Sequence, residues 1–269
     1  MRTVKNLCLR ANKFLPSDIK LTLDTACDYE ISPNGKRALN SIIENYKTAQ
    51  HTGLPICQDT GMVVVFAEIG QDVHIAGELF EDAVNEGVRQ AYNEGNLRKS
   101  VVYDPLNRVN SGDNTPAIIH VRLVQGNSIS LTVVPQGAGG ENASSLRMFH
   151  PSATREDRYV VSCVQENGGK SCTPLIVGVG IGGDSEMATL LAKKALCRDL
   201  FTYNKKLLYT DMESEILDRV NRLGIGPENM GGTVTALAVN ILSYPTHVSC
   251  LPVAVSLGCH ATRHATEVI

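Results

Sequence analysis

Apolar, β-branched runs alternate along the chain with stretches whose apolar residues recur at helical spacing. The runs "MVVVFAEI" (62–69), "AIIHVRLV" (117–124), "ISLTVVP" (129–135), "PLIVGVGI" (174–181) and "PVAVSL" (252–257) predict strands. Helical spacing predicts helices over 35–49, 79–93, 184–203 and 211–223, the third with Asp184 or Ser185 as its N-cap. Interleaved strands and helices favour a layered α/β architecture, and since no long linker separates them, we expect residues 1–269 to form one compact domain.

Glycines gather in four loops next to these predicted strands. The loops are "PQGAGGENAS" (135–144), "NGGKSC" (167–172), "GVGIGGDSE" (178–186) and "MGGT" (230–233). Glycine permits positive φ and a close approach of the backbone to a ligand, and loops at strand ends are where α/β proteins bind ligands. Four such loops around one core indicate an elaborate site.

One of these loops matches a nucleotide-binding pattern. Residues 178–183, "GVGIGG", fit G-x-G-x-x-G between a predicted strand and a predicted helix. The acidic residue about 20 positions further on in that pattern would be Asp199. Asp199 falls near the end of the predicted helix, where a second strand tip is required. Close packing of helix on sheet is therefore the favoured interpretation of these glycines, and a nucleotide-binding oxidoreductase remains an alternative.

Composition excludes several classes of partner. Apolar residues make up 43% of the chain and charged residues 20%, with a net charge of −3, so neither nucleic acid nor an anionic membrane is expected as the main partner. No apolar run reaches the ~18 residues of a membrane span. The start, "MRTVKNLCLRANKF", lacks the apolar core of a secretion signal. We expect a cytoplasmic protein whose eight cysteines are reduced thiols.

Three of the eight cysteines share a setting that the others lack. Cys57 in "PICQDTG", Cys172 in "GGKSCTP" and Cys259 in "SLGCHATRH" each lie beside a predicted strand among small or polar residues. Each could be an incidental buried thiol. Acting jointly, three thiolates suit a [4Fe–4S] cluster with one iron that lacks a protein ligand and can act as a Lewis acid. The competing metal is a structural zinc ion, for which His260 could be the fourth ligand.

The combination of motifs resembles one enzyme family. "LPICQDTG", "NLRKS", "GDNTPA", "GGKSCTP", "VGIGG" and "LPVAVSLGCHATRH", in this order, resemble the alpha subunit of the iron–sulfur hydro-lyases, which are the class I fumarases and the L(+)-tartrate dehydratases. The resemblance runs from about residue 35 to the end of the sequence. It implies a single α/β domain of mixed sheets surrounded by helices.

The resemblance also implies a set of site residues. It assigns the cluster to Cys57, Cys172 and Cys259, and a dicarboxylate substrate to Gln58, Asp59, Arg98, Gly139, Gly140 and His247. Ala138 interrupts the glycines of "GAGG", which leaves open which residue of 137–140 contacts the substrate. Supporting roles fall to Arg108, Asn110, Asp113 and Asn114. His260 and His264 stand at i, i+4 spacing, but a second metal site there is disfavoured.

The expected activity is reversible hydration of fumarate to malate, with dehydration of L(+)-tartrate as the alternative. Asp59 is expected to handle the leaving hydroxyl. The single-chain enzymes of the family carry a further domain, and this sequence ends soon after Cys259. A separate beta subunit is therefore expected to supply the base and further substrate-binding groups, in a hetero-oligomer of α2β2 type. A non-catalytic cluster-binding scaffold is a more distant alternative.

Overall fold

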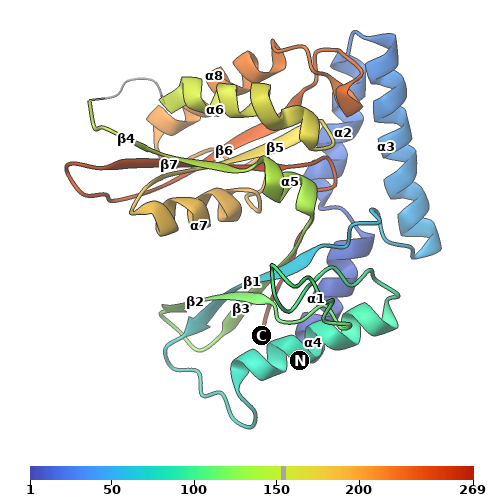
Figure 1. The fold of residues 1–269 in the computed structure, drawn as a ribbon, viewed down its shortest axis with the longest axis vertical. Helices are drawn as coiled ribbons and strands as arrows, with labels where there is room; N and C mark the ends of the chain where they lie inside the picture. The colour runs from blue at the N-terminus through green and yellow to red at the C-terminus, as the bar shows by residue number, and fades with distance from the viewer. Residues whose placement is uncertain (153–155) are drawn as a thin grey trace. The chain divides into compact units, whose positions relative to one another are not determined.

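The computed structural model describes residues 1–152 and 156–269, which form two compact units (Figure 1). Unit 1 comprises Met1–Pro16, Tyr46–Ala138 and Arg263–Ile269, and unit 2 comprises Ser17–Asn45 and Gly139–Thr262. The chain thus passes between the units several times. The expectation of one domain over residues 1–269 stays a prediction, whereas the mixed α/β fold class is confirmed.

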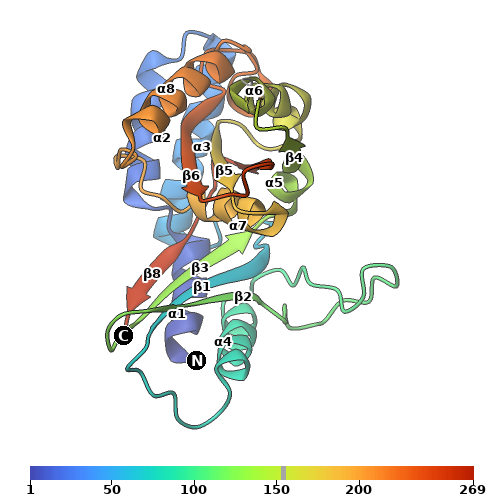
Figure 2. The ribbon, with the colours of Figure 1, turned by 90° about the vertical axis from the view of Figure 1, so that its left-hand side faces the viewer.

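Unit 1 is built on a four-stranded sheet in the order β2-β1-β3-β8. β1 (Met62–Gly70) pairs in parallel with β2 (Ile118–Val124) and antiparallel with β3 (Ile129–Gln136), which also pairs antiparallel with β8 (Ala265–Val268). Helices α1 (Arg2–Lys13) and α4 (Phe80–Glu94) lie on one face of this sheet (Figure 2). Their apolar sides enclose a core with β1 and β3 that includes Leu7, Val65, Val88, Tyr92 and Val133.

Unit 2 is built on a second mixed sheet in the order β4-β7-β5-β6. β5 (Leu175–Gly182) is parallel to β6 (Ala236–Tyr244) and antiparallel to β7 (Leu251–Gly258), which pairs antiparallel with β4 (Ser145–Phe149). Helix α7 (Ser185–Ala195) covers one face, and α6 (Glu156–Asn167) and α8 (Leu207–Asn221) cover the other (Figure 1). Because both faces are covered, β5 and β7 are apolar along most of their length.

The remaining elements are helices. They are α2 (Ser17–Tyr29), α3 (Pro33–Thr52), α5 (Ala138–Ala143) and the short 3₁₀ helices η1 (Gly168–Lys170) and η2 (Pro227–Asn229). Among the described residues, no helix has the length and apolar character that crossing a membrane requires.

The predicted elements are confirmed with one correction. All five predicted strands are present, as β1, β2, β3, β5 and β7, and three of the predicted helices correspond to α3, α4 and α8. The helix predicted over 184–203 ends at Ala195, so that prediction was wrong in its second half. The buried Asn240 side chain donates a hydrogen bond to the carbonyl of Ala195 at 3.0 Å, which caps the helix there. Asp184 is the N-cap, and its carboxylate accepts from the N–H of Met187 at 2.8 Å.

The "GVGIGG" glycines serve helix packing, as the sequence favoured. A Cβ atom on Gly178 would lie 2.2 Å from the carbonyl oxygen of Ala192, and one on Gly180 would lie 2.0 Å from that of Ala188. Both oxygens belong to α7, so the helix rests directly on the backbone of β5. The space that a cofactor would need beside these glycines is filled by the protein's own helix.

Candidate functional site

The "CQDTG" loop of unit 1 connects α3 to β1 and is held at both ends. At its start, the N–H of Ile56 donates to the carbonyl of Asn12 at 2.9 Å. At its end, the buried hydroxyl of Tyr92 donates to the carbonyls of Thr60 at 2.5 Å and Gly61 at 3.0 Å. Between these anchors Cys57 is half-buried and Gln58 is exposed, so both side chains can reach a ligand.

Asp59 is fixed on both sides of its carboxylate. Oδ2 accepts a hydrogen bond from the N–H of Ala138 at 2.8 Å, and Oδ1 accepts one from the N–H of Gly61 at 3.2 Å. The guanidinium of Arg263 donates to the main-chain carbonyl of Asp59. A Cβ atom on Gly137 would lie 3.2 Å from Oδ2, so a side chain at this position would crowd the carboxylate. Arg263 was not among the predicted site residues, although it lies within the motif "GCHATRH".

The segment that carries Arg98 is tied to the same loop. The hydroxyl of Thr60 donates to the carbonyl of Arg98 at 2.7 Å, while the Arg98 side chain is exposed. Asn114, fully buried and with a left-handed φ of 65°, accepts from the N–H of Ser100 at 2.7 Å and donates to the carbonyl of Gly61 at 3.1 Å. These bonds fasten the main chain around Arg98 to the loop that carries Asp59, and they leave the Arg98 guanidinium exposed.

The other residues with expected supporting roles act within the 99–115 loop. Asp113 accepts from Arg89 Nε at 2.8 Å and from the hydroxyl of Thr115 at 2.7 Å. Burial raises its pKa, but the Thr115 and Arg89 hydrogen bonds outweigh burial and bring the pKa down to about 2. Asn110 donates to the carbonyl of Lys99 at 2.9 Å, and Arg108 is exposed with a φ of 62°. These side chains shape the loop.

Unit 2 brings the second and third cysteine loops together. Cys172 stands just before β5 and Cys259 just after β7. Because β5 and β7 are antiparallel, with Ile176 opposite Gly258, the start of one strand lies beside the end of the other. The N–H of His260 donates to the carbonyl of Cys172 at 3.1 Å, which fastens the two loops directly. The carbonyl of Cys259 accepts from the hydroxyl and the N–H of Thr262.

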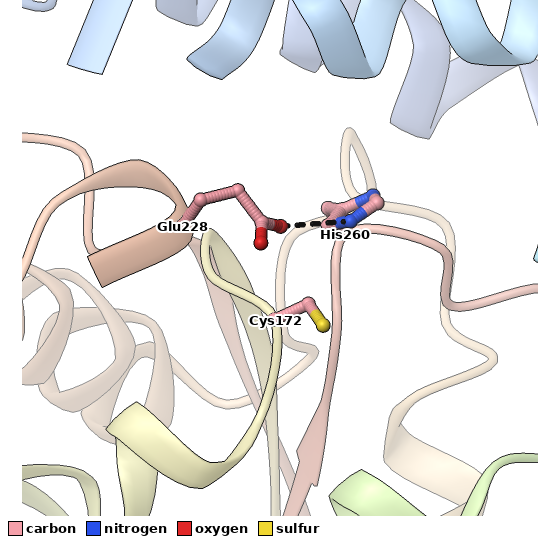
Figure 3. Close-up of side chains that lie close together, drawn as sticks. All are labelled: Cys172, Glu228 and His260. Carbon is pink, nitrogen blue, oxygen red and sulfur yellow. Dashed lines mark ion pairs between the residues drawn. The ribbon is translucent and has the colours of Figure 1, made fainter. Parts of the chain in front are cut away.

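Two further side chains approach Cys172 (Figure 3). Glu228 Oε1 lies 3.1 Å from His260 Nε2, and the Sγ, carboxylate and imidazole ligand atoms of Cys172, Glu228 and His260 all lie within 4.8 Å of one another. Cys172 is exposed, and the other two are half-buried. His260 was predicted as a possible metal ligand, whereas Glu228 was not, because nothing in "GIGPENM" marks its glutamate as a neighbour of Cys172.

The remaining predicted residues of unit 2 are accessible. Gly139 and Gly140 lie in the first turn of α5, so this part of the expected glycine loop is helical. The nearest atom to a Cβ on Gly139 would be the carbonyl oxygen of Lys170, 3.6 Å away, just before the Cys172 loop. His247 is exposed in the turn between β6 and β7, where its Nδ1 accepts from the N–H of Ser249 at 3.2 Å.

The predicted site residues are thus divided between the units. Cys57, Gln58, Asp59 and Arg98 belong to unit 1, and Gly139, Gly140, Cys172, His247 and Cys259 belong to unit 2. Within unit 1, hydrogen bonds from the Thr60 and Asn114 side chains to main-chain carbonyls join the Cys57 loop to the Arg98 segment. Within unit 2, the β5–β7 register gathers Cys172 and Cys259. None of the cysteines, all of which lie in the described residues, forms a disulfide.

Comparison with known proteins places the chain in a family. Residues 1–268 match the family model described as "Fumarate hydratase (Fumerase)". A protein of Methanocaldococcus jannaschii, named "Putative L(+)-tartrate dehydratase subunit alpha", is 38% identical over 273 residues, which cover 98% of this chain and 95% of the relative. L(+)-tartrate dehydratase subunits alpha of Escherichia coli and Shigella sonnei are 29% and 28% identical over 272 residues, which cover 99% of this chain and 89% of each relative. The chain belongs to the fumarate hydratase family, as the motifs indicated.

Proposed function

We propose that the chain is the alpha, cluster-binding subunit of a two-subunit [4Fe–4S] hydro-lyase that interconverts fumarate and malate. The observation that carries the proposal is the pairing of the Cys172 and Cys259 loops by the antiparallel β5 and β7 strands, fastened by the His260 to Cys172 main-chain bond. Membership of the fumarate hydratase family supports the same activity.

The residues fit a cluster in their chemistry. Cys172 is exposed and Cys57 and Cys259 are half-buried, so their thiols are accessible, as cluster ligands must be during assembly. When bound, a cluster with one iron lacking a protein ligand supplies a Lewis acid for a hydroxyl and a carboxylate. Oxidation destroys such clusters readily, so a reducing cytoplasm is part of the proposal.

The chain's own side chains then have distinct roles. Arg98 presents a guanidinium fork that matches one carboxylate of a dicarboxylate, and Gln58, exposed beside Cys57, offers an amide to the same substrate. Asp59, held by Ala138 and Gly61, positions or protonates the hydroxyl that leaves. Gly139, Gly140 and His247 complete the substrate contacts. A beta subunit supplies the base that removes the proton from carbon, in an α2β2 complex.

The proposal is tested with the anaerobically reconstituted complex of this chain and its beta partner. The complex should be brown and should convert malate to fumarate, and native mass measurement should give α2β2. Cys57→Ala, Cys172→Ala and Cys259→Ala should each lose both colour and turnover, whereas Cys27→Ala, on α2, should keep both. Retention of the visible absorption by all three variants would refute the cluster assignment.

L(+)-tartrate is the second candidate substrate, and the names of the relatives favour it. Tartrate differs from malate by one hydroxyl, so the same carboxylate contacts serve both substrates. Measuring kcat/KM of the complex for malate and for L(+)-tartrate decides between them. A preference of tenfold or more for tartrate, about 1.4 kcal/mol in the barrier, would replace fumarate as the assigned substrate.

A further inference from the structure

We propose that, in the chain without its cluster, Cys172, Glu228 and His260 form a mononuclear site for a borderline-soft divalent transition metal such as Zn²⁺. Their ligand atoms lie within 4.8 Å of one another, and all three side chains belong to unit 2 (Figure 3). The inference goes beyond the proposed function, because it concerns the chain before a cluster is bound; the ion and the cluster would use the Cys172 thiolate in turn.

The ligand set selects the metal. Thiolate, imidazole and carboxylate together suit Zn²⁺, Fe²⁺ or Co²⁺, whereas Mg²⁺ and Ca²⁺ prefer all-oxygen sites. Bond lengths of about 2.0–2.3 Å around a tetrahedral ion bring ligands closer together than 4.8 Å, so modest rotation of the side chains completes the site. Three protein ligands leave one position for water, as in open zinc sites.

Main-chain hydrogen bonds hold the three ligands in one frame. On one side, the N–H of His260 donates to the carbonyl of Cys172 at 3.1 Å. On the other side, the N–H of Glu228 donates to the carbonyl of Thr173 at 2.9 Å, and the Thr173 hydroxyl donates to the carbonyl of Gly226 at 2.6 Å. The Cys172–Thr173 segment is thus fastened to both partner loops, and metal binding would cost little ordering of the backbone.

The backbone at Glu228 is strained in a way that presents its side chain. Glu228 has φ 48° and Asn229 has φ 59°, so two consecutive non-glycine residues are left-handed. Such a conformation is unfavourable for a non-glycine residue and persists only where its surroundings fix it. Here the N–H groups of both residues are bonded to Thr173, at 2.9 Å to its carbonyl and 3.1 Å to its hydroxyl. The strained turn directs the Glu228 carboxylate toward His260.

Glu228 Oε1 is the atom best placed to coordinate. It is buried and lies 3.1 Å from His260 Nε2, yet no donor in the described part of the chain gives it a hydrogen bond of good geometry. A buried carboxylate oxygen without a hydrogen bond is stabilised by any partner that brings positive charge to it. A divalent ion between Glu228, His260 and Cys172 would be such a partner.

The test uses the full chain, purified anaerobically without cluster and titrated with Co²⁺. We expect one ion per chain, with thiolate-to-cobalt charge-transfer absorption in the near ultraviolet and tetrahedral bands in the red. Glu228→Gln and His260→Gln should each weaken binding by at least about tenfold, the lower limit for losing even an outer-shell partner. Cys172→Ser should remove the charge-transfer band. His150→Gln, at an exposed histidine, is the matched control and should bind as the wild type does.

One variant separates this inference from the proposed function. Cys57→Ser should abolish the reconstituted cluster but leave the Co²⁺ spectrum unchanged, because Cys57 is not one of the three proposed ligands. Glu228→Gln should lose the Co²⁺ site and still take up the cluster. Circular dichroism confirms that each variant is folded. A Co²⁺ spectrum without charge transfer, or one that Glu228→Gln and His260→Gln leave unchanged, would overturn the inference.

Discussion

The carboxylate of Asp59 accepts a hydrogen bond from the N–H of Ala138 at 2.8 Å, which joins the "CQDTG" loop to the first residue of α5, far away in the sequence. Its other oxygen accepts from the N–H of Gly61 at 3.2 Å. The polar residue that follows Cys57 and Gln58 is therefore already oriented by the fold. Orientation of this kind lowers the free-energy cost of reaching the reactive geometry, because a positioned acid or base does not have to rearrange when the substrate binds.

Replacing Asp59 tests its role in the chemistry. In the reconstituted complex, Asp59→Asn should lower kcat by about 10²–10⁴-fold, the range for loss of a general acid or base. The visible absorption of the cluster should stay, since Asn is isosteric and Cys57 is untouched. Asp72→Asn, at an exposed position after β1, is the control and should retain full turnover. Wild-type turnover of Asp59→Asn would remove Asp59 from the mechanism.

Glu30, directly after α2, is a buried carboxylate of unit 2 that accepts several main-chain hydrogen bonds. It is 1% exposed and accepts from the N–H groups of Ser32 at 2.8 Å, Thr233 at 3.0 Å and Val234 at 2.8 Å. Burial acts to raise its pKa, but these main-chain donors together lower it below the ordinary value. The carboxylate therefore stays ionised and joins α2 to the loop before β6.

Glu30→Ala should destabilise the protein by about 3 kcal/mol or more, because several buried N–H groups lose their partner at once. Urea unfolding at neutral pH followed by circular dichroism measures the loss. Glu78→Ala, at an exposed glutamate before α4, is the control and should lie within about 0.5 kcal/mol of the wild type. Equal stability of the two variants would show that these hydrogen bonds contribute nothing.

The fold was predictable where strands are buried on both faces. β1, β5 and β7 are continuous apolar runs, and such runs stand out in a sequence. β6 was missed because Asn240 interrupts its apolar run; this side chain is buried and donates to the carbonyl of Ala195 at the end of α7. β4 is short, and its central residues are exposed, so it has no apolar signature. Helix α1 was not predicted, although its sequence has apolar residues at helical spacing. Its buried side is formed by Val4, Leu7, Cys8 and Ala11.

Site residues could be predicted from the sequence where they are neighbours within one motif. Cys57, Gln58 and Asp59 are adjacent in sequence, and the resemblance named them together. Arg263 and Glu228 were missed because their roles arise from long-range contacts, with the carbonyl of Asp59 and with His260. A glutamate in a turn has no local pattern that reveals a distant cysteine as its neighbour.

Asp113 should make stability depend on pH in the acid range. Its pKa is about 2 in the folded protein, against about 3.9 for an unperturbed aspartate, so folding favours the ionised form. The stabilisation is therefore complete above the unfolded pKa and is lost as the pH falls from about 4 toward 2. Carbon-13 NMR of the Asp113 carboxyl should give a midpoint near 2. In urea unfolding, Asp113→Asn should be less stable than the wild type at pH 7, and the difference should shrink by pH 3. A midpoint near 4 would contradict the bond to Arg89.

Replacing Gly180 tests the direct contact of α7 with β5. A Cβ there would lie 2.0 Å from the carbonyl oxygen of Ala188 and 2.7 Å from the amide nitrogen of Ala192, and main-chain atoms in a packed helix cannot move aside cheaply. Gly180→Ala should therefore cost about 1–3 kcal/mol or more in urea unfolding, although alanine is otherwise better tolerated in regular structure than glycine. Gly169→Ala is the control, because the nearest atom to its Cβ would be Asn229 Oδ1 at 3.6 Å, an ordinary contact distance. If Gly180→Ala were as stable as the wild type, α7 would not rest on β5 as closely as described, and the space for a cofactor beside "GVGIGG" would have to be reconsidered.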